Sequence, residues 1–156
     1  ITAIAALNII SEKNFIEKVS NISKLLKNNL QKIKEKHVDK IEEIKGNGIL
    51  NGIVFKSYMS ELGNLVEKIP INSIKDKSSF LKKITATAIS SELYKKYNIL
   101  TAINDSSFSN HLCISPSLVI KKEEVEYFFD CLSKILNENL NLKSIEIVLN
   151  FVKSKL

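Results

Sequence analysis

Arginine and tryptophan are absent from this sequence of 156 residues, and methionine occurs once. The net charge of +6 therefore comes from lysine. Many of these lysines alternate with glutamates along stretches that are predicted to be helical, as in residues 32–43, which is typical of a solvated helix face. The few aromatic residues fall at core-like helical positions, such as Phe128 and Phe129, and do not alternate with basic residues as stacking platforms do. We therefore expect no nucleic-acid partner.

Cysteine is also scarce, since only Cys113 and Cys131 are present, without CxxC spacing or a histidine cluster. This pattern contains no recognisable zinc or other metal site and argues against a disulfide framework. We expect two buried free thiols in a reducing compartment. No apolar run approaches the roughly 20 residues that span a bilayer, and the first residues lack the charged region and cleavage site of a signal peptide. The expected location is the cytoplasm, without membrane association.

Hydrophobic periodicity predicts most of the secondary structure, and 44% apolar content is enough for one compact core. Residues 1–10 are small and apolar, start without a capping residue and resemble the second half of a helix. Apolar positions at helical spacing predict a long amphipathic helix from Phe15 to Lys36. The later predicted elements are strands at 41–44 and 49–55, a helix at 79–97, strands at 99–103 and 111–115 around a polar loop at 104–110, and a helix at 121–140.

This order of elements predicts an α+β fold with helices packed on one face of a small, mostly antiparallel sheet. Residues 57–77, interrupted by Gly63 and Pro70, show no regular pattern. The last residues, 141–156, carry a narrow apolar seam that predicts an additional helix lying against another helix or a partner chain. The seam consists of Leu142, Ile145, Leu149, Val152 and Leu156.

Three stretches, in this order and at this separation, carry a family resemblance. Residues 3–33 resemble an Ala-rich interdomain helix followed by a long first helix of a small domain. IKGNGILNGIVF at 44–55 resembles the pattern Arg-Gly-x-Gly-Leu-x-x-Gly-Ile, with Lys45 in place of the Arg. HLCISPSLVIKKEEVEYFFDCL at 111–132 resembles an Arg-bearing strand that runs into Pro-Pro-Leu-x-Ile and an acidic helix start. Together they resemble the C-terminal small domain of class III pyridoxal-phosphate (PLP) aminotransferases of fold type I.

The resemblance implies a domain division and a function. Residues 1–12 would be the end of the interdomain helix, 13–140 the small domain and 141–156 the additional helix. The intact enzyme would transfer an amino group between an amine or amino acid and an oxo acid or aldehyde, through a ping-pong Schiff-base mechanism. Its partners would be the large PLP-binding domain of the same protein and a second subunit in a homodimer.

The resemblance also implies which functional groups are missing from these residues. In the family the Schiff-base lysine, the Asp beside the pyridine nitrogen and the phosphate cradle lie in the large domain. We therefore assign no catalytic or cofactor-binding residue here. We expect this chain to be one part of an enzyme, and we expect the chain alone to be inactive and to bind no PLP.

One substrate-binding position is implied, at Cys113. In many family members this position is an Arg that makes a planar two-pronged contact near the substrate carboxylate, which a thiol cannot make. Ser117 likewise replaces the second Pro of the pattern. Either the intact enzyme accepts a donor or acceptor without a carboxylate there, or its pocket differs. The alternative is that Cys113 is a small residue facing the core.

The glycines and histidines receive structural interpretations. Gly46, Gly48 and Gly52 predict positive φ or close approach of another chain segment, although an ordinary hairpin with a bulge explains them equally well. His37 is expected to be a solvated residue at a helix C-terminus, and His111 to start a strand, without a functional role for either.

The rival function is a free-standing, non-catalytic interaction module that binds a partner through the C-terminal seam.

Overall fold

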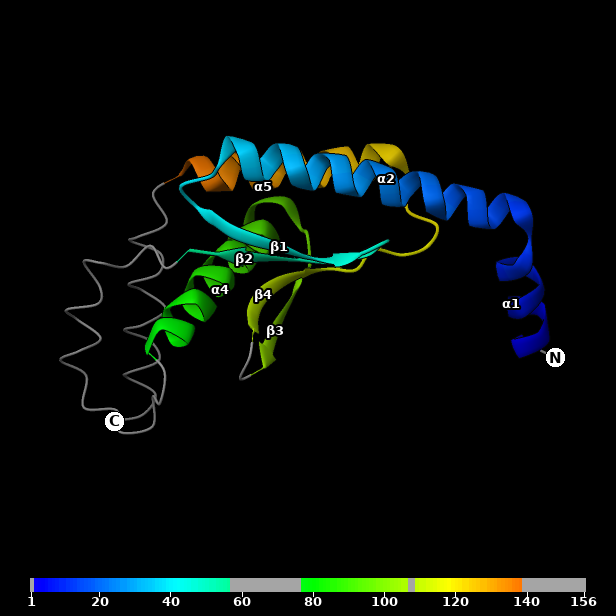
Figure 1. The fold of residues 1–156 in the computed structure, drawn as a ribbon, viewed down its shortest axis with the longest axis horizontal. Helices are drawn as coiled ribbons and strands as arrows, with labels where there is room; N and C mark the ends of the chain where they lie inside the picture. Colours follow the sequence, from blue (N-terminus) through cyan, green and yellow to red (C-terminus); the bar gives the residue numbers. More distant parts are fainter. Residues whose placement is uncertain (1, 57–76, 107–108, 139–156) are drawn as a thin grey trace.

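The computed structural model describes residues 2–56, 77–106 and 109–138, which form helices and a small sheet (Figure 1). Along the chain the elements are α1 (Thr2–Ser11), α2 (Lys13–Lys36), β1 (Ile41–Asn47), β2 (Leu50–Phe55), α4 (Lys77–Tyr97), β3 (Ala102–Ser106), β4 (Ser109–Ile114) and α5 (Lys122–Asn137). The predicted α+β class and the predicted order of elements are confirmed. The predicted helix at 141–156 and all but the last residue of the irregular stretch 57–77 lie outside the described residues, and Lys77 begins α4.

The four strands form one antiparallel sheet in the order β1-β2-β4-β3. Consecutive strands pair within each half of the sheet, and the two halves join where β2 lies beside β4. Gly52 of β2 is thereby paired with Cys113 of β4. The glycine-rich stretch and the stretch before Pro116, which are far apart in the sequence, are therefore neighbours in the sheet.

The turn between β1 and β2 explains the first two glycines. Gly46 has φ 103° and Gly48 has φ 64°, which is the left-handed region that glycine adopts without steric strain. A Cβ on Gly46 would lie 2.1 Å from the carbonyl oxygen of Leu50. The Asn47 side-chain oxygen accepts a hydrogen bond from the Gly48 N–H at 2.9 Å. The predicted positive φ is confirmed for Gly46 and Gly48, which lie at the turn of a hairpin between the two predicted strands.

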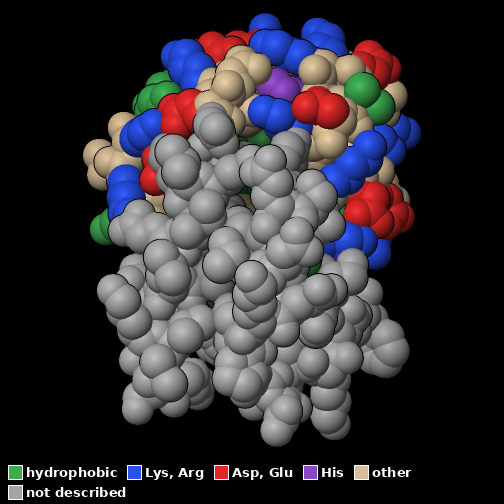
Figure 2. Space-filling model, turned by 90° about the vertical axis from the view of Figure 1, so that its left-hand side faces the viewer, with side chains coloured by type: hydrophobic (Ala, Val, Ile, Leu, Met, Phe, Trp, Pro, Cys, Tyr) green, Lys and Arg blue, Asp and Glu red, His purple; other side chains and the backbone are tan. Residues whose placement is uncertain are grey.

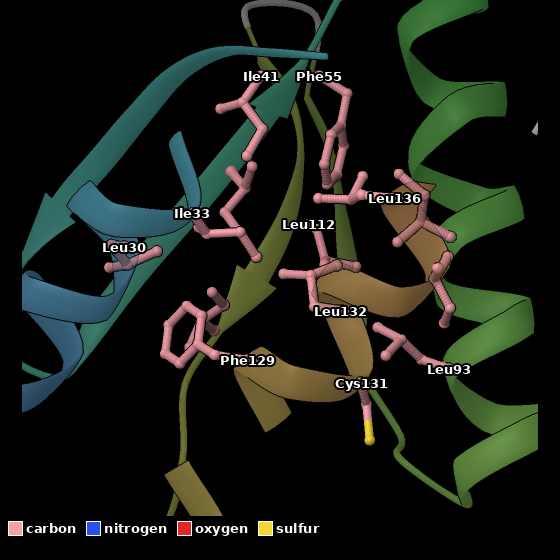
Figure 3. Close-up of a cluster of buried hydrophobic side chains, with 14 of the residues drawn as sticks. Leu30, Ile33, Ile41, Phe55, Leu93, Leu112, Phe129, Cys131, Leu132 and Leu136 are labelled. Carbon is pink, nitrogen blue, oxygen red and sulfur yellow. The ribbon is translucent and has the colours of Figure 1, made fainter. Parts of the chain in front are cut away.

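Three helices, α2, α4 and α5, cover one face of the sheet and enclose the core (Figure 3). Alternate residues of the strands point toward them, such as Ile53 and Phe55 of β2 and Leu112 of β4. The helices contribute the remaining large buried side chains: Leu26, Leu30, Ile33, Ile89, Leu93, Val125, Phe129, Leu132, Ile135 and Leu136. α1 projects beyond the sheet from the far end of α2 (Figure 1) and exposes most of its apolar residues, including Ile4 and Leu7.

The third strand is shifted along the chain from its predicted position. The expected strand at 99–103 is found at 102–106, so part of the predicted polar loop is strand. Asn98, at φ 55°, ends α4 in the left-handed conformation, and the chain needs several further residues to reach the sheet. β3 is an edge strand whose backbone pairs with β4, for example Asn104 with His111, so polar residues are tolerated there.

His37 is the second correction, because it is buried and not solvated. It ends α2 as predicted, but its side chain is only 3% exposed. Its Nε2 lies 3.2 Å from the hydroxyl oxygen of Ser133 on α5, which also accepts a hydrogen bond from the Lys36 ammonium at 2.8 Å. Lys40 donates to the carbonyl oxygen of Leu136. The histidine therefore belongs to a polar contact that joins the end of α2 to α5.

Candidate functional site

A row of paired residues crosses the sheet on the face opposite the helices. Lys45 of β1 stands opposite Gly52 of β2, Gly52 stands opposite Cys113 of β4, and Cys113 stands opposite Ala102 of β3. Directly paired residues project from the same face of a sheet. The neighbours of Cys113, Leu112 and Ile114, point into the core, so the row points away from it.

Cys113 is therefore not a residue of the core. Its side chain is half-buried, whereas Cys131 on α5 is fully buried in the core, and neither forms a disulfide. The expectation of two free thiols is confirmed, but the expectation that both are buried is wrong for Cys113. The alternation of a strand explains the difference, because residues 111 and 113 share the face opposite to residues 112 and 114.

His111 fills the space that Gly52 leaves open. His111 was expected to start its strand, but it is the third residue of β4. A Cβ on Gly52 would lie 2.3 Å from Cδ2 of the imidazole and 3.0 Å from its Cγ and Nε2. Gly52 is thus required for close approach of another segment and not for positive φ. The ring lies over the middle of the row, between the positions of Lys45 and Cys113.

A small pocket of about 230 Å³ opens along this row. Its described lining residues come from the β1–β2 hairpin and from β4: Lys45, Gly46, Leu50, Asn51, Gly52, His111, Cys113, Ile114 and Ser115. Among them Lys45 is the residue with a full charge, and its ammonium lies 3.4 Å from the carboxylate of Glu43, which is not part of the lining. Burial, and secondarily the ammonium of Lys45, lowers the pKa of His111 below 6.5, so its imidazole is mainly neutral at neutral pH.

A larger pocket of about 800 Å³ shares Cys113, Ile114 and Ser115 with the small one. It lies between the end of α4, the exit of β4 and the start of α5. Its lining is mostly apolar and aromatic and includes Tyr97, Pro116 and Phe128. Leu100 and Val119, which also line it, are 84% and 75% exposed. Cys113 therefore lines two hollows, and the exposed lining of both is mainly apolar.

The chain's charge is dispersed over the described surface that is visible in Figure 2. Blue Lys and red Asp and Glu side chains alternate over that part of the molecule, without a continuous basic strip. Within residues 2–56, 77–106 and 109–138, three or more His, Cys, Asp or Glu side chains do not gather as metal ligands. Likewise, the helices of these residues include none that is long and apolar enough to cross a membrane.

Comparison with known proteins decides the family. The sequence profile of the family described as aminotransferase class-III matches residues 1–136, which is most of the chain. The chain belongs to the class III aminotransferases. Of the elements described above, all but the last residue of α5 lie within the match, including the four strands that carry the row of paired residues from Lys45 to Ala102.

Individual aminotransferases are similar to this chain over parts of their length. The mitochondrial acetylornithine aminotransferase of Candida glabrata is 42% identical over 50 residues, which cover 32% of this chain and 12% of that protein. A transaminase from the marine bacterium Virgibacillus has a similar structure, with a TM-score of 0.61 and 15% identity over 94% of this chain and 28% of that one. The adenosylmethionine-8-amino-7-oxononanoate aminotransferase of Methanocaldococcus jannaschii has a TM-score of 0.59 and 21% identity. This match covers 86% of this chain and 26% of that one. The chain thus spans about a quarter of the length of these structures, which share its fold.

Class III aminotransferases use PLP, but the described residues do not fit it. The lysine of the larger pocket, Lys121, is exposed, and its backbone N–H donates to the Glu124 carboxylate at 2.8 Å. A phosphate at this helix start would meet the carboxylates of Glu123 and Glu124 instead of open N–H groups. The described lining of the small pocket contains no carboxylate that could pair with a pyridine nitrogen. No step of catalysis is therefore assigned to the cofactor here.

Sequence reasoning identified Cys113 but assigned no role to His111, Asn51 or Ser115, which line the same pocket. A signal for His111 was present in the alternation of its strand. His111 and Cys113 are two residues apart, flanking the apolar Leu112, so a half-buried strand places both on one face. The position of Lys45 beside them depends on β2 pairing with β4, which no local pattern specifies.

Proposed function

We propose that residues 13–140 are the C-terminal small domain of a PLP-dependent transaminase, with residues 1–12 as the end of the interdomain helix and 141–156 as an additional helix. The intact protein transfers an amino group between an amine or amino acid and an oxo acid or aldehyde. It acts in the cytoplasm as a homodimer, and PLP is held by a large domain of the same protein.

The observation that carries this proposal is the pairing of Gly52 with Cys113. It joins the two stretches that resemble the family's glycine pattern and its Pro-Pro-Leu pattern, and it places both on the face that the helices leave uncovered. The family match over residues 1–136 supports the same conclusion independently of the geometry. A substrate-facing surface needs side chains that are held rigidly by a sheet and are open on one side, as these are.

The small domain contributes shape and exclusion of water. The exposed Leu100 and Val119 at the larger pocket form an apolar rim, and covering it with the large domain removes water from the neighbouring Cys113. Cys113 then acts as a specificity position. Because a thiol cannot form the paired charge-assisted hydrogen bonds of a guanidinium, it does not bind a substrate carboxylate in that way.

The proposal is tested with the 156-residue chain and with the protein encoded by its complete gene. The gene is expected to encode a large domain with a Schiff-base lysine, and that protein is expected to transaminate. The chain alone, treated with PLP and borohydride and analysed by mass spectrometry, should show no stoichiometric label. Labelling of one specific lysine in the chain alone would refute the division of labour, and a complete protein without transaminase activity would refute the function.

The rival function, an interaction module acting through the seam at residues 142–156, depends on residues outside the described part of the chain. No described contact favours it over the transaminase.

A further inference from the structure

The C-terminal ends of α2 and α5 lie side by side in the layer of helices, on the side of the sheet opposite to the Cys113 row (Figure 1). Ser133 of α5 is partly exposed there, and two basic groups from the end of α2 contact its hydroxyl oxygen. The Lys36 ammonium donates to Oγ at 2.8 Å, and Nε2 of the buried His37 lies 3.2 Å from it. Helix C-termini favour nearby cations, but this preference does not explain why an ammonium and an imidazole meet at one hydroxyl.

The directions of these hydrogen bonds follow from the groups involved. An ammonium can only donate, so Oγ of Ser133 accepts from Lys36 and its own proton is available to His37. Nε2 accepts that proton when the imidazole is neutral and carries its hydrogen on Nδ1. Burial, and then the ammonium groups of Lys36 and Lys40, lower the pKa of His37, which Asp39 raises to a smaller extent. The imidazole is therefore mainly neutral at pH 7, as a base has to be.

We propose that Ser133 is a nucleophile that takes the acyl group of an activated ester, with His37 as its base and Lys36 as the cation beside the reacting oxygen. A hydroxyl within hydrogen-bond reach of a neutral imidazole is the arrangement that activates serine in acyl transfer. An ammonium 2.8 Å from the same oxygen stabilises negative charge that develops near it during attack. The inference concerns a different site and a different reaction from transamination, so it does not rest on the proposed function.

The step needs only the ester as co-reactant. Oγ of Ser133 forms a bond to the carbonyl carbon of the ester while Nε2 of His37 takes the hydroxyl proton. The electron pair displaced onto the carbonyl oxygen returns as the bond to the leaving alcohol breaks. His37 then gives its proton to the leaving oxygen, so the products are acyl-Ser133 and the free alcohol.

The first test treats the 156-residue chain with an alkyl fluorophosphonate and locates the label by mass spectrometry. The reagent forms an Oγ–P bond while fluoride leaves, and the label stays on the serine. Ser133 is expected to be labelled. Ser11 is the matched control, because it is exposed and its described hydrogen bond goes to the carbonyl oxygen of Leu7 at 2.7 Å. The chain should also release a burst of p-nitrophenolate from p-nitrophenyl acetate, which Ser133→Ala should lack.

Three variants assign the roles of the neighbouring groups. His37→Gln should slow labelling of Ser133 by about 100-fold, the lower end of the usual effect of a positioned general base. Lys36→Gln should slow it by about threefold, as expected for a partly exposed charge. Lys27→Gln removes another exposed lysine of α2 and should leave the rate unchanged. Far-UV circular dichroism shows whether each variant has kept its fold.

The pH dependence of labelling in the unaltered chain tests the base without a substitution, and it decides the matter if His37→Gln does not fold. The charged groups that act on His37 are Lys36, Lys40 and Asp39, from the end of α2 and the turn after it, and Ser133 is its described contact on α5. The rate should rise through the folded-state pKa of His37, below 6.5, and be level above about pH 7.5. An ordinary serine reacts as its alkoxide, so its rate would continue to rise beyond about pH 9.

Absence of label at Ser133, equal labelling of Ser11, or a burst that persists in Ser133→Ala would each overturn the inference. A rate that rises continuously with pH, or a folded His37→Gln chain that is labelled as fast as the unaltered one, would also overturn it. These outcomes are separable from a failure of the proposed function, because none of them is measured by transamination.

Discussion

Substituting Gly52 by alanine tests the geometry of the sheet face most directly. The new Cβ would lie 2.3 Å from Cδ2 of His111, so the imidazole or the strand must move. Gly52 does not have a positive φ, so alanine adopts its backbone conformation without strain and the effect comes from the clash. We expect the free energy of unfolding to fall by about 1–3 kcal/mol, the usual range for an overpacked site.

A double-mutant cycle with His111→Ala isolates the clash. When the imidazole is removed, the added methyl group has space, so the double variant should be more stable than the sum of the single effects predicts, by about 1–3 kcal/mol. The measurement is urea unfolding followed by far-UV circular dichroism. Thermal unfolding should agree, at roughly 2–4 °C per kcal/mol for a chain of this size.

Gly48→Ala is the matched control, because nothing lies within 4 Å of its Cβ position and its φ is 64°. It should lose about 1–2 kcal/mol through backbone strain alone. This loss should add to that of His111→Ala without coupling. If Gly52→Ala also shows simple additivity with His111→Ala, the ring does not lie over Gly52 and the described floor of the small pocket is wrong.

Three further predictions follow from the same geometry. Burial, together with the ammonium groups of Lys36 and Lys40, lowers the pKa of His37 below its ordinary 6.5, so its contribution to stability is complete above that pH and is lost as the pH falls through the folded-state pKa. His37→Gln should therefore reduce the loss of unfolding free energy between about pH 7.5 and pH 5; an unchanged loss would contradict this. An aromatic disulfide reagent should modify one thiol per native chain rapidly, at the half-buried Cys113 and not at the fully buried Cys131, and Cys113→Ser should abolish the fast phase. On the proposed function, Cys113→Arg in the protein encoded by the complete gene should change the ratio of kcat/KM between donors with and without a carboxylate while leaving PLP affinity the same; unchanged ratios would show that residue 113 does not face the substrate.

The helices and the first hairpin could be predicted because local forces specify them. The apolar positions of α2 recur at helical spacing, and three of them, Leu26, Leu30 and Ile33, are buried as the pattern requires. Gly46 and Gly48 lie between two apolar segments, where only glycine adopts the turn conformation readily. In these segments the preference of the backbone and the demand of the core agree, so one sequence window contains the whole signal.

β3 and His37 could not be predicted because their structures depend on distant partners. Asn104, polar and followed by further polar residues, has no local reason to be in a strand, and it is extended because β4 offers its backbone hydrogen bonds. His37 follows a lysine-rich helix end, which is typical of a solvated position. It is nevertheless buried because Ser133, 96 residues away, supplies a polar partner on the packed helix α5.

The candidate site combines both situations, which explains why it was predicted only in part. Cys113 was identified from the family resemblance of the consecutive residues 111–132. The alternation of side chains along its strand already implies that Cys113 shares a face with His111. Lys45 is added to this pair by two successive pairings, β1 with β2 and β2 with β4, and only the first follows from a local turn. A cation on the first hairpin can therefore serve a pocket whose other wall is β4, 68 residues later, counted from Lys45 to Cys113 (113 − 45). The thiol of Cys113 and the position of Lys45 across Gly52 have to be judged together, since the sheet makes them parts of one surface.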